Sequence, residues 1–388
     1  MNAKHLITLA GLAAVMAGLA TWSSRKEIQK TEAASLGSKA FPSLQTQVNE
    51  ITSIRIQSPA ETATVTRVGG IWRVPGKWNY PADFGKIRDL LRKLADTKIL
   101  QAVRTTPAER GELQLLTSAD TGATNREQCA TRIQLLDSQG SAISSLYLGK
   151  TRSRPGPESG MGGFPDSQFV MTEKGQASLI GDTFPEVTTR DKDWLDTDFL
   201  ALTDIIDIHV AGKPTGEIHA TRATPADDLK VQGTLPENKE VDATKLSSLG
   251  SALSFLKFDD LVDPKLPPEK TGLDKPVIYK ATSKKGEKIT LRIGKSPAGD
   301  TKRYASVSVA FEAPSLPAPS GSDTNQAALA QAREKENTQT AASTKLLNDK
   351  FSPWIYLLSP ETAETITQGF HDILKDKPKP QDQKENVK

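Results

Sequence analysis

The chain has 388 residues, of which 25% are charged and 36% hydrophobic, an ordinary composition for a globular body of two or three domains. Its 50 basic and 47 acidic residues nearly cancel to a net charge of +3, so no broad positive field attracts nucleic acid, and we expect no nucleic-acid partner. Cys129 is the only cysteine, which excludes an intrachain disulfide, a zinc knuckle and a CxxC redox pair.

An apolar segment opens the chain. Residues 6–22 contain no charged side chain, and basic residues flank them on both sides. In a helix these seventeen residues span about 26 Å, slightly less than the roughly 30 Å hydrocarbon core of a bilayer. We therefore predict a membrane anchor or signal over residues 1–26 and favour an uncleaved transmembrane helix. Gly18 and Ala20 keep a cleaved secretory signal open as the alternative.

The basic residues on both sides do not by themselves orient this segment. The short tail before it and its signal-like layout favour a body outside the cytoplasm. We expect a single-pass protein of the cell inner membrane whose body lies in the periplasm or an equivalent extracytoplasmic space. Residues 27–47, rich in Lys, Ser, Ala and Gln without sustained periodicity, predict a stalk.

Two segments of the chain repeat the same order of elements. The matching positions are Ile51 and Ile205 at the first strand, Asp83 and Asp242 at the start of a helix, and Gly149 and Gly294 before a lysine. Their separations are 154, 159 and 145 residues, and such drifting offsets indicate a duplication with small insertions. We therefore predict two homologous modules, over residues 48–200 and 201–370.

In the first module, β-branched and aromatic residues over 51–74 predict short strands, with a tight turn at Gly69 and Gly70. Asp83 then starts a helix whose apolar residues recur with helical spacing. These residues are Ile87, Leu90, Leu91 and Leu94. Turn residues 137–140 separate two alternating segments, which indicates a hairpin.

The second module repeats these elements. Its strands are predicted at 205–210, 218–220 and 229–231, its helix begins after Asp242 with Leu246, Leu249, Leu253 and Leu256, and its hairpin turns at 284–286. Each module is predicted to close with a strand and a short helix, at 169–180 and at 354–366.

Two segments of biased composition interrupt or follow the second module. Residues 312–350, rich in Pro, Ser, Ala, Gln and Asn, predict a low-complexity insertion, in which 326–336 form a lone helix as the alternative to a mobile loop. Residues 371–388 are charged and predict a disordered tail.

Hairpins dominate over βαβ crossovers in this pattern, which indicates an α+β fold. We predict two homologous modules, each a mostly antiparallel sheet with one long packed helix, plus an N-terminal transmembrane helix.

In chain order these motifs resemble the DUF4340 domain, a bacterial family of unknown function. The resemblance rests on the Ile-x-x-Ile-x-Ile opening, residues 70–74, the Asp-started helix, residues 271–276, the Leu-Gly-Lys or Ile-Gly-Lys motif, and Tyr304. It covers about residues 48–366, and the chain departs from the pattern at the glycine-rich loop 156–163 and at the long insertion. Members are typically anchored at the N-terminus, and many are encoded beside ABC transporters of the gliding-motility type. The resemblance implies an extracytoplasmic accessory role with ABC transporter subunits as partners, and it supplies no catalytic residue.

One motif is typical of nucleotide chemistry. Gly149-Lys150-Thr151 matches the end of a phosphate-binding loop, but Ser144 stands where that loop needs a glycine, and no helix follows. We interpret the motif as a structural corner at a strand end, repeated at Gly294.

The remaining reactive residues form no catalytic set. His209 and His219 lie on adjacent predicted strands, but two imidazoles fall short of the three or four ligands that zinc requires. We interpret Cys129 as a half-buried structural residue, and the acid pairs 227–228 and 259–260 as turn residues. We expect no enzymatic activity, no cofactor and no metal.

Three residues are candidates for partner binding. Trp78 lies in a loop before the first helix, where an exposed aromatic is typical of an interface. Arg152 and Arg154 lie at the start of the glycine-rich stretch 153–163, which predicts either a partner loop or a flexible linker.

The predicted function is that of a membrane-anchored extracytoplasmic accessory or scaffold protein, associated with an ABC-type transporter as the resemblance implies. The alternative is a module that binds cell-wall glycan or a small ligand in the cleft between the two modules, because ligand sites favour domain interfaces. A hydrolase whose carboxylates converge only in the folded chain is a third hypothesis.

Overall fold

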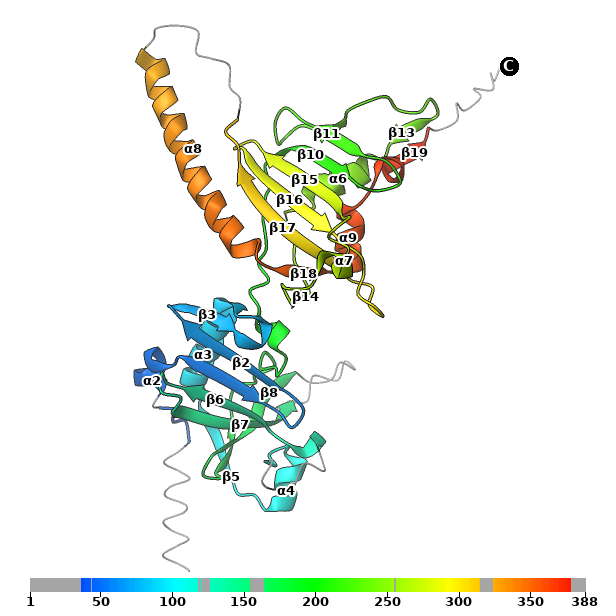
Figure 1. The fold of residues 1–388 in the computed structure, drawn as a ribbon. Helices are drawn as coiled ribbons and strands as arrows, with labels where there is room; N and C mark the ends of the chain where they lie inside the picture. Colours follow the sequence, from blue (N-terminus) through cyan, green and yellow to red (C-terminus); the bar gives the residue numbers. More distant parts are fainter. Residues whose placement is uncertain are drawn as a thin grey trace, which may run out of the picture. The chain divides into compact units, whose positions relative to one another are not determined.

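The computed structural model describes residues 36–42, 44–117, 120, 126–153, 164–254, 256–314 and 324–377. The chain divides into two compact units, of which unit 1 ends at Asp196 and unit 2 begins at Thr197, a few residues before the predicted boundary at 200/201. Each unit is built on a large antiparallel sheet with helices, so the predicted α+β class is confirmed (Figure 1). The predicted membrane segment, residues 1–26, lies outside the described residues.

The described residues of unit 1 form a nine-stranded sheet. Its strands are β1 (Ser53–Gln57), β2 (Thr62–Val68), β3 (Ile71–Val74), β4 (Tyr80–Pro81), β5 (Ile99–Val103), β6 (Thr131–Leu136), β7 (Ala142–Ser153), β8 (Pro165–Thr172) and β9 (Ala177–Ile180). Its helices are α2 (Leu44–Gln47), α3 (Phe84–Asp96) and α4 (Pro107–Glu112), with 3-10 turns η1 (Val48–Glu50), η2 (Pro75–Lys77), η3 (Arg126–Gln128) and η4 (Asp191–Trp194).

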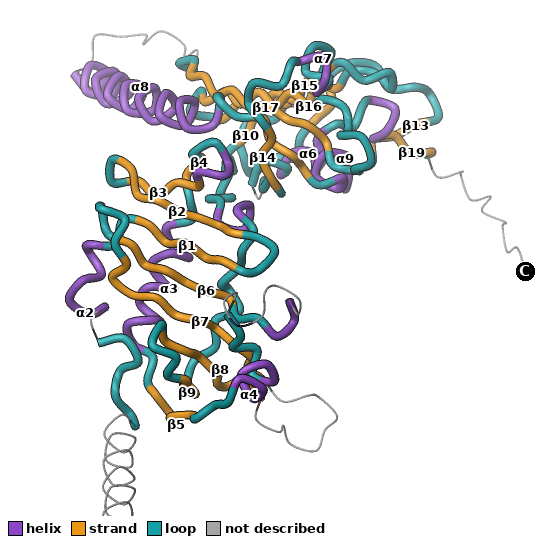
Figure 2. The backbone as a smooth tube through the Cα atoms, turned by 60° about the horizontal axis from the view of Figure 1, so that its bottom comes forward, coloured by secondary structure: helices purple, strands orange, loops and turns teal. Residues whose placement is uncertain are grey.

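The strand order of this sheet is β4-β3-β2-β1-β6-β7-β8-β9-β5, with every neighbouring pair antiparallel (Figure 2). Gly69 and Gly70 form the turn between β2 and β3 with φ of 60° and 83°, the positive values that favour glycine. The carboxylate of Asp83 accepts a hydrogen bond from the backbone N–H of Lys86 at 3.0 Å, which confirms it as the N-cap of α3. All four predicted apolar residues of α3 are buried.

The segment predicted as the end of a stalk belongs to unit 1. Phe41 and Leu44 are buried, and Ala40 donates a backbone hydrogen bond to Thr97 at 2.9 Å. The stalk prediction is therefore wrong for the described part of 36–47, because two apolar side chains suffice to anchor a short segment without producing a periodic pattern. The earlier part of the predicted stalk lies outside the described residues.

The described residues of unit 2 form an eight-stranded sheet and a two-stranded one. The strands are β10 (Ile205–Ala211), β11 (Ile218–Thr221), β12 (Lys230–Val231), β13 (Lys239–Val241), β14 (Asp260–Val262), β15 (Val277–Ser283), β16 (Glu287–Ile293), β17 (Arg303–Phe311), β18 (Ile355–Leu358) and β19 (Leu374–Asp376). The helices are α6 (Ala243–Ser251), α7 (Pro268–Thr271), α8 (Thr324–Phe351) and α9 (Pro360–Ile366), with the 3-10 turn η5 (Phe370–Ile373).

The two large sheets share one topology. Unit 2 has the order β12-β11-β10-β15-β16-β17-β18-β14, and unit 1 has β3-β2-β1-β6-β7-β8-β9-β5 after its outermost strand β4. Each strand thus has a counterpart at the same place in its sheet. The helices α3 and α6 lie between the counterpart strands along the chain, and so do α4 and α7. This shared order is the arrangement that a duplication predicts.

The helix of unit 2 is shorter than predicted. Asp242 caps α6 by accepting hydrogen bonds from the backbone N–H groups of Thr244 and Lys245. The Tyr279 hydroxyl donates to the Leu249 carbonyl at 3.0 Å, which ties the helix to the sheet. The helix ends at Ser251, so the predicted residues Leu253 and Leu256 lie beyond it, although both are buried. The spacing of the apolar residues thus indicated that these two leucines are buried, but it did not predict their backbone conformation.

The closing elements differ between the units. Residues 175–180, predicted as a short helix, contain the turn at Gly175 and strand β9, because the segment pairs with β8 as a hairpin. In unit 2 the predicted strand and helix are confirmed as β18 and α9. The counterpart of β18 is therefore β9, and not the segment 169–171, which lies within β8.

The predicted low-complexity insertion contains a long helix. Helix α8 has 28 residues, more than twice the length of the alternative helix at 326–336. Its last turns pack on β17, where the Asn348 side chain accepts a hydrogen bond from the Val309 N–H at 2.9 Å and Phe351 is buried. Good helix formers such as Ala, Gln, Glu and Lys explain the helix, and its mostly exposed surface explains the missing apolar stripe.

The predicted disordered tail begins too early. Residues 371–377 are part of unit 2: they complete η5 and form β19, which pairs with β13 in the two-stranded sheet. Residues 378–388 lie outside the described residues.

Among the residues that the structure describes, no helix has the length and apolar character of a membrane span.

The Gly-Lys motif of unit 1 lies inside β7, and not at a strand end as predicted. The Lys150 N–H donates to the carbonyl of Leu113 at 2.8 Å. A Cβ on Gly149 would lie 2.4 Å from that carbonyl oxygen. Gly149 is therefore required by the close approach of a second backbone segment.

The second Gly-Lys motif repeats this contact in unit 2. Here the Lys295 N–H donates to the carbonyl of Thr271 at 2.9 Å, and a Cβ on Gly294 would lie 2.1 Å from that oxygen. The interpretation of both motifs as a repeated structural contact, and not a phosphate site, is consistent with this geometry.

We predict that Gly149→Ala and Gly294→Ala each lower the free energy of unfolding by about 1 to 3 kcal/mol, because the added methyl group overlaps a carbonyl oxygen. Gly181→Ala is the matched control, since its Cβ would meet Leu100 only at 3.4 Å. Chemical denaturation should show a change of about 0.5 kcal/mol or less for the control. Equal effects at all three glycines would contradict the close-contact explanation.

Candidate functional site

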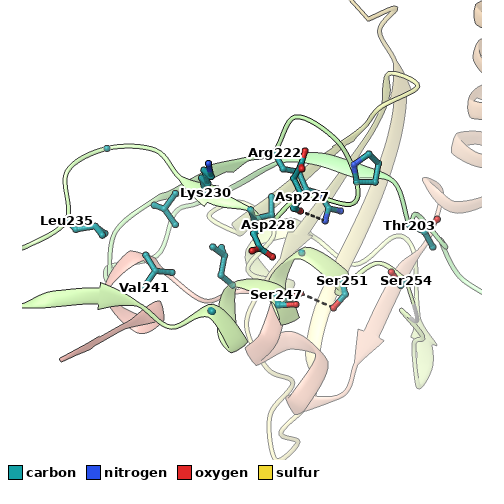
Figure 3. A pocket seen from close by; sticks show the side chains of 17 residues that line it. Thr203, Arg222, Asp227, Asp228, Lys230, Leu235, Val241, Ser247, Ser251 and Ser254 are labelled. Carbon is teal, nitrogen blue, oxygen red and sulfur yellow. Dashed lines mark hydrogen bonds between the residues drawn. The ribbon is translucent and has the colours of Figure 1, made fainter. Parts of the chain in front are cut away.

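Unit 2 contains a half-open groove with a volume of about 540 Å³ (Figure 3). It lies between α6 and the segment that leads from β11 to β13. Its lining comprises apolar residues Leu229, Val231, Leu235, Val241 and Leu246, charged residues Arg222, Asp227, Asp228 and Lys230, and hydroxyl residues Thr203, Ser247, Ser251 and Ser254. The volume falls within the range of about 300 to 1,000 Å³ that is usual for ligand sites.

One wall of the groove is the solvent-facing side of α6. Leu246 and Leu249 are buried, whereas Ser247 and Ser251, about one turn apart on the same helix, are exposed. Ser247 and Ser251 therefore face the groove, and the Ser251 hydroxyl donates to the Ser247 carbonyl at 3.0 Å (Figure 3). Ser248 is exposed on the same helix but does not line the groove.

The opposite wall is a braced loop. The Asp227 carboxylate accepts hydrogen bonds from the hydroxyl and the backbone N–H of Thr224 at 2.9 and 2.8 Å, and these bonds lower its pKa. Arg222 donates to the Ile205 carbonyl at 2.5 Å and to the Asp227 carbonyl at 3.4 Å. Arg222 and Asp227 therefore hold the loop, as the prediction of a turn role for Asp227 expects.

Two charged side chains of the groove remain available to a ligand. Asp228 and Lys230 form no hydrogen bond or ion pair through their side chains with any residue that the structure describes. Leu229, between them in sequence, packs over Gly250, where a Cβ would lie 2.6 Å from the leucine Cδ1. The small glycine thus lets the loop approach α6 and sets the depth of the groove.

A cluster around Asp372 holds the C-terminal segment beside this groove. Asp372 accepts hydrogen bonds from the Gly369 N–H at 2.8 Å and the Thr215 hydroxyl at 2.9 Å, and it pairs with Lys213 at 2.9 Å. Partial burial opposes ionisation, but these three partners outweigh it and lower the pKa of Asp372 to about 2. The Lys245 ammonium on α6 donates to the Asp372 carbonyl at 2.7 Å, which links the cluster to the helix.

A second hollow, of about 470 Å³, contains the histidine pair. His209 and His219 are directly opposite each other on β10 and β11, with ring centroids 6.0 Å apart. Each ring meets its own carboxylate, His219 at 2.8 Å from Asp207 and His209 at 3.5 Å from Glu217. The two pairs therefore form polar contacts between neighbouring strands. Across the described residues, no three His, Cys, Asp or Glu side chains gather as possible metal ligands.

The other acid pair, Asp259 and Asp260, lies at the start of β14. The Asp260 carboxylate accepts a hydrogen bond from the Leu261 N–H at 2.7 Å, and the Asp259 N–H donates to the Leu357 carbonyl at 2.8 Å. These contacts are structural ones.

Of the three predicted partner-binding residues, the structure describes Trp78 and Arg152. Trp78 is 40% exposed, with a left-handed φ of 53° at the end of η2. Arg152 lies in β7 and donates to the Ser167 hydroxyl at 3.1 Å. Arg154 lies outside the described residues, as does most of the glycine-rich stretch 153–163.

The groove was missed from the sequence. A usable signal was present, because the segment that leads to the helix cap is longer in the second module, residues 222–241 against 67–82, and Ser247, Ser251 and Ser254 recur at helical spacing. That α6 and the loop enclose a hollow follows only from their packing.

Comparison with known protein families gives one match. The model of DUF4340, described as a domain of unknown function, matches residues 72–276, from β3 of unit 1 to the residue before β15 in unit 2. No curated protein and no solved structure matches the chain.

We predict that Asp372→Asn lowers the free energy of unfolding by about 1 to 2 kcal/mol at pH 7, a value reduced for the partial exposure of the side chain. Because the folded pKa is about 2 and the usual value is 3.8, this stabilisation is complete above about pH 4 and is lost as the pH falls through 2. The two proteins should therefore converge in urea denaturation at low pH.

Asp376→Asn is the matched control, since its partner Lys239 lies 2.7 Å away but the aspartate side chain is 82% exposed. A small effect at every pH is expected for this exposed pair. A pH-independent difference between Asp372→Asn and the unsubstituted chain would contradict the role assigned to the Asp372 carboxylate.

Proposed function

Because the chain belongs to the DUF4340 family, a family of unknown function, we propose its role from the residues themselves: a membrane-anchored extracytoplasmic accessory protein that binds a protein partner and performs no catalysis. The apolar segment 6–22 supports the anchor, and its signal-like layout supports a body outside the cytoplasm. An ABC-type transporter complex is the partner that the family resemblance suggests.

The observation that carries this proposal is the placement of α8. The counterpart strands β8 and β9 are joined by a short hairpin in unit 1, whereas β17 and β18 are separated by this helix of 28 residues. Only the last turns of α8 pack on the sheet, and most of its described side chains are exposed, including Leu329 and Leu346 at 56% and 70%. The helix therefore adds surface and contributes little to the core, which suits a contact with another protein.

The alternative hypothesis of a glycan site is less well supported by the groove of unit 2. Sugar sites commonly offer an aromatic face, and the described lining of the groove includes no aromatic side chain.

The test is recovery of the full-length protein from native membranes after mild crosslinking, with the mass of its N-terminus measured in parallel. We expect an intact N-terminal segment and co-purification of a membrane partner. In a matched variant, residues 315–338 are replaced by a Gly-Ser linker of equal length, which removes the first half of α8, with the exposed Leu329, and keeps the later turns, with Leu346 and the residues that pack on β17.

This variant should keep its melting temperature within a few degrees, because the replaced residues of α8 contribute little buried surface, and it should lose the partner. If the variant recovers the same partner, the replaced part of α8 does not contact that partner. A protein cleaved near Ala20 that recovers no membrane partner would overturn the proposed function.

A further inference from the structure

The two units differ at one edge of their shared sheet. In unit 1 the strand β3 is followed outward by β4, and Val74 pairs with Tyr80 across them. In unit 2 the counterpart β12 is the outermost strand, with no described strand beyond it. The groove of about 540 Å³ lies at this open edge, because Lys230 and Val231 of β12 both line it.

Strand register identifies which residue faces the open position. Ile54 pairs with Val65 in unit 1 as Ile208 pairs with Ala220 in unit 2. Val231 pairs with Ala220. In unit 1, Thr66 of β2 pairs with Arg73 of β3, and because the two strands are antiparallel, Val65 is opposite Val74. Val231 therefore holds in β12 the place that Val74 holds in β3, and the position beside it is that of Tyr80.

The strand that would fill this position is paired elsewhere. In unit 1, one residue separates β4 from the N-cap of α3, and in unit 2, β13 ends at the residue next to the N-cap of α6. Instead of joining β12, β13 pairs with β19, with Val241 opposite Leu374. The Asp372 cluster keeps β19 in place, so β13 stays away from the sheet edge.

The backbone of the edge is oriented toward the groove. The Gln232 N–H donates to the His219 carbonyl at 2.7 Å, so Gln232 forms a hydrogen-bonded pair with β11. In an antiparallel ladder such pairs alternate with pairs that point their N–H and C=O groups the other way. The N–H and C=O of Val231 therefore face the open edge, where an added strand would bond to them.

We propose that this groove binds an extended peptide segment of a partner protein, which adds a strand to β12 and occupies the place that β4 has in unit 1. The inference rests on the proposed function in assigning the groove to a protein partner. Tyr80 is fully buried at the matching position of unit 1, so the peptide places a bulky apolar side chain there, against Leu229 and Leu246. Two positive and two negative residues line the groove, and they favour neither an acidic nor a basic peptide.

The test uses a phage-displayed library of random nine-residue peptides selected on the full-length protein, followed by synthesis of the enriched sequences. Dissociation constants are measured by fluorescence anisotropy. Ser247→Trp fills the groove from α6, and Ser248→Trp is the matched control, exposed on the same helix but outside the groove. We expect Ser247→Trp to weaken binding at least tenfold and Ser248→Trp to leave it within about twofold, because only the first variant occupies the groove.

A second measurement leaves the protein unchanged. N-methylation of the peptide at one backbone position at a time should weaken binding at alternate positions, since only every second amide of an added strand faces β12. Hydrogen exchange should show protection of the Val231 amide by the bound peptide. Each of three results would overturn the proposal. The peptides bind Ser247→Trp as tightly as the unsubstituted protein, the methylation scan shows no alternation between neighbouring positions, or the library yields no enriched peptide.

A second copy of the chain is a competing occupant, and sedimentation tests it. A dimer that is lost in Ser247→Trp would assign the edge to self-association and overturn the proposal. The membrane recovery experiment separates this inference from the proposed function. If Ser247→Trp loses the peptide but keeps its membrane partner, the groove binds a different partner. If the unsubstituted protein recovers no membrane partner, the accessory role is overturned, but the measured peptide site stands.

Discussion

The edge of an antiparallel sheet exposes backbone N–H and C=O groups that must find partners, and the two units meet this constraint in different ways. Unit 1 closes the edge at β3 with its own β4. In unit 2 the corresponding segment, β13, pairs with β19, which leaves β12 outermost and a groove beside it. The ordered C-terminal segment, the cluster around Asp372 and the open edge are consequences of this one exchange of strand partners.

The duplication provides an internal comparison of core and surface. What the units share is the eight-strand order, the capped helix and the close backbone contact at Gly149 and Gly294, all of which pack the interior. What unit 2 adds, namely α8 and the loop from β11 to β13, lies at the surface. Additions that leave a core unchanged are most simply explained by contact with other molecules, and the two proposals made for this protein rest on different additions.

Much of the fold was predictable because its signals are local. The positive φ of Gly69 and Gly70, and the caps at Asp83 and Asp242, depend on residues within a few positions of each other. The family, inferred from the order of several weak motifs, is confirmed. Predictions failed where a short apolar segment was read without its neighbours: residues 177–180 form a strand because β8 lies beside them, and Phe41 belongs to the core because unit 1 buries it.

The sequence by itself determined the repeated order of opening strands, capped helix and hairpin in both units, the α+β class and the family, since turn glycines, helix caps and apolar spacing act over short stretches of chain. Only the tertiary structure decided that Val241 pairs with Leu374 and that Val231 faces an open edge. Strands of two or three residues carry no periodic signal, and partners more than a hundred residues apart are selected by the geometry of the whole unit. The groove results from this choice of strand partners, so no single residue in the sequence predicts it.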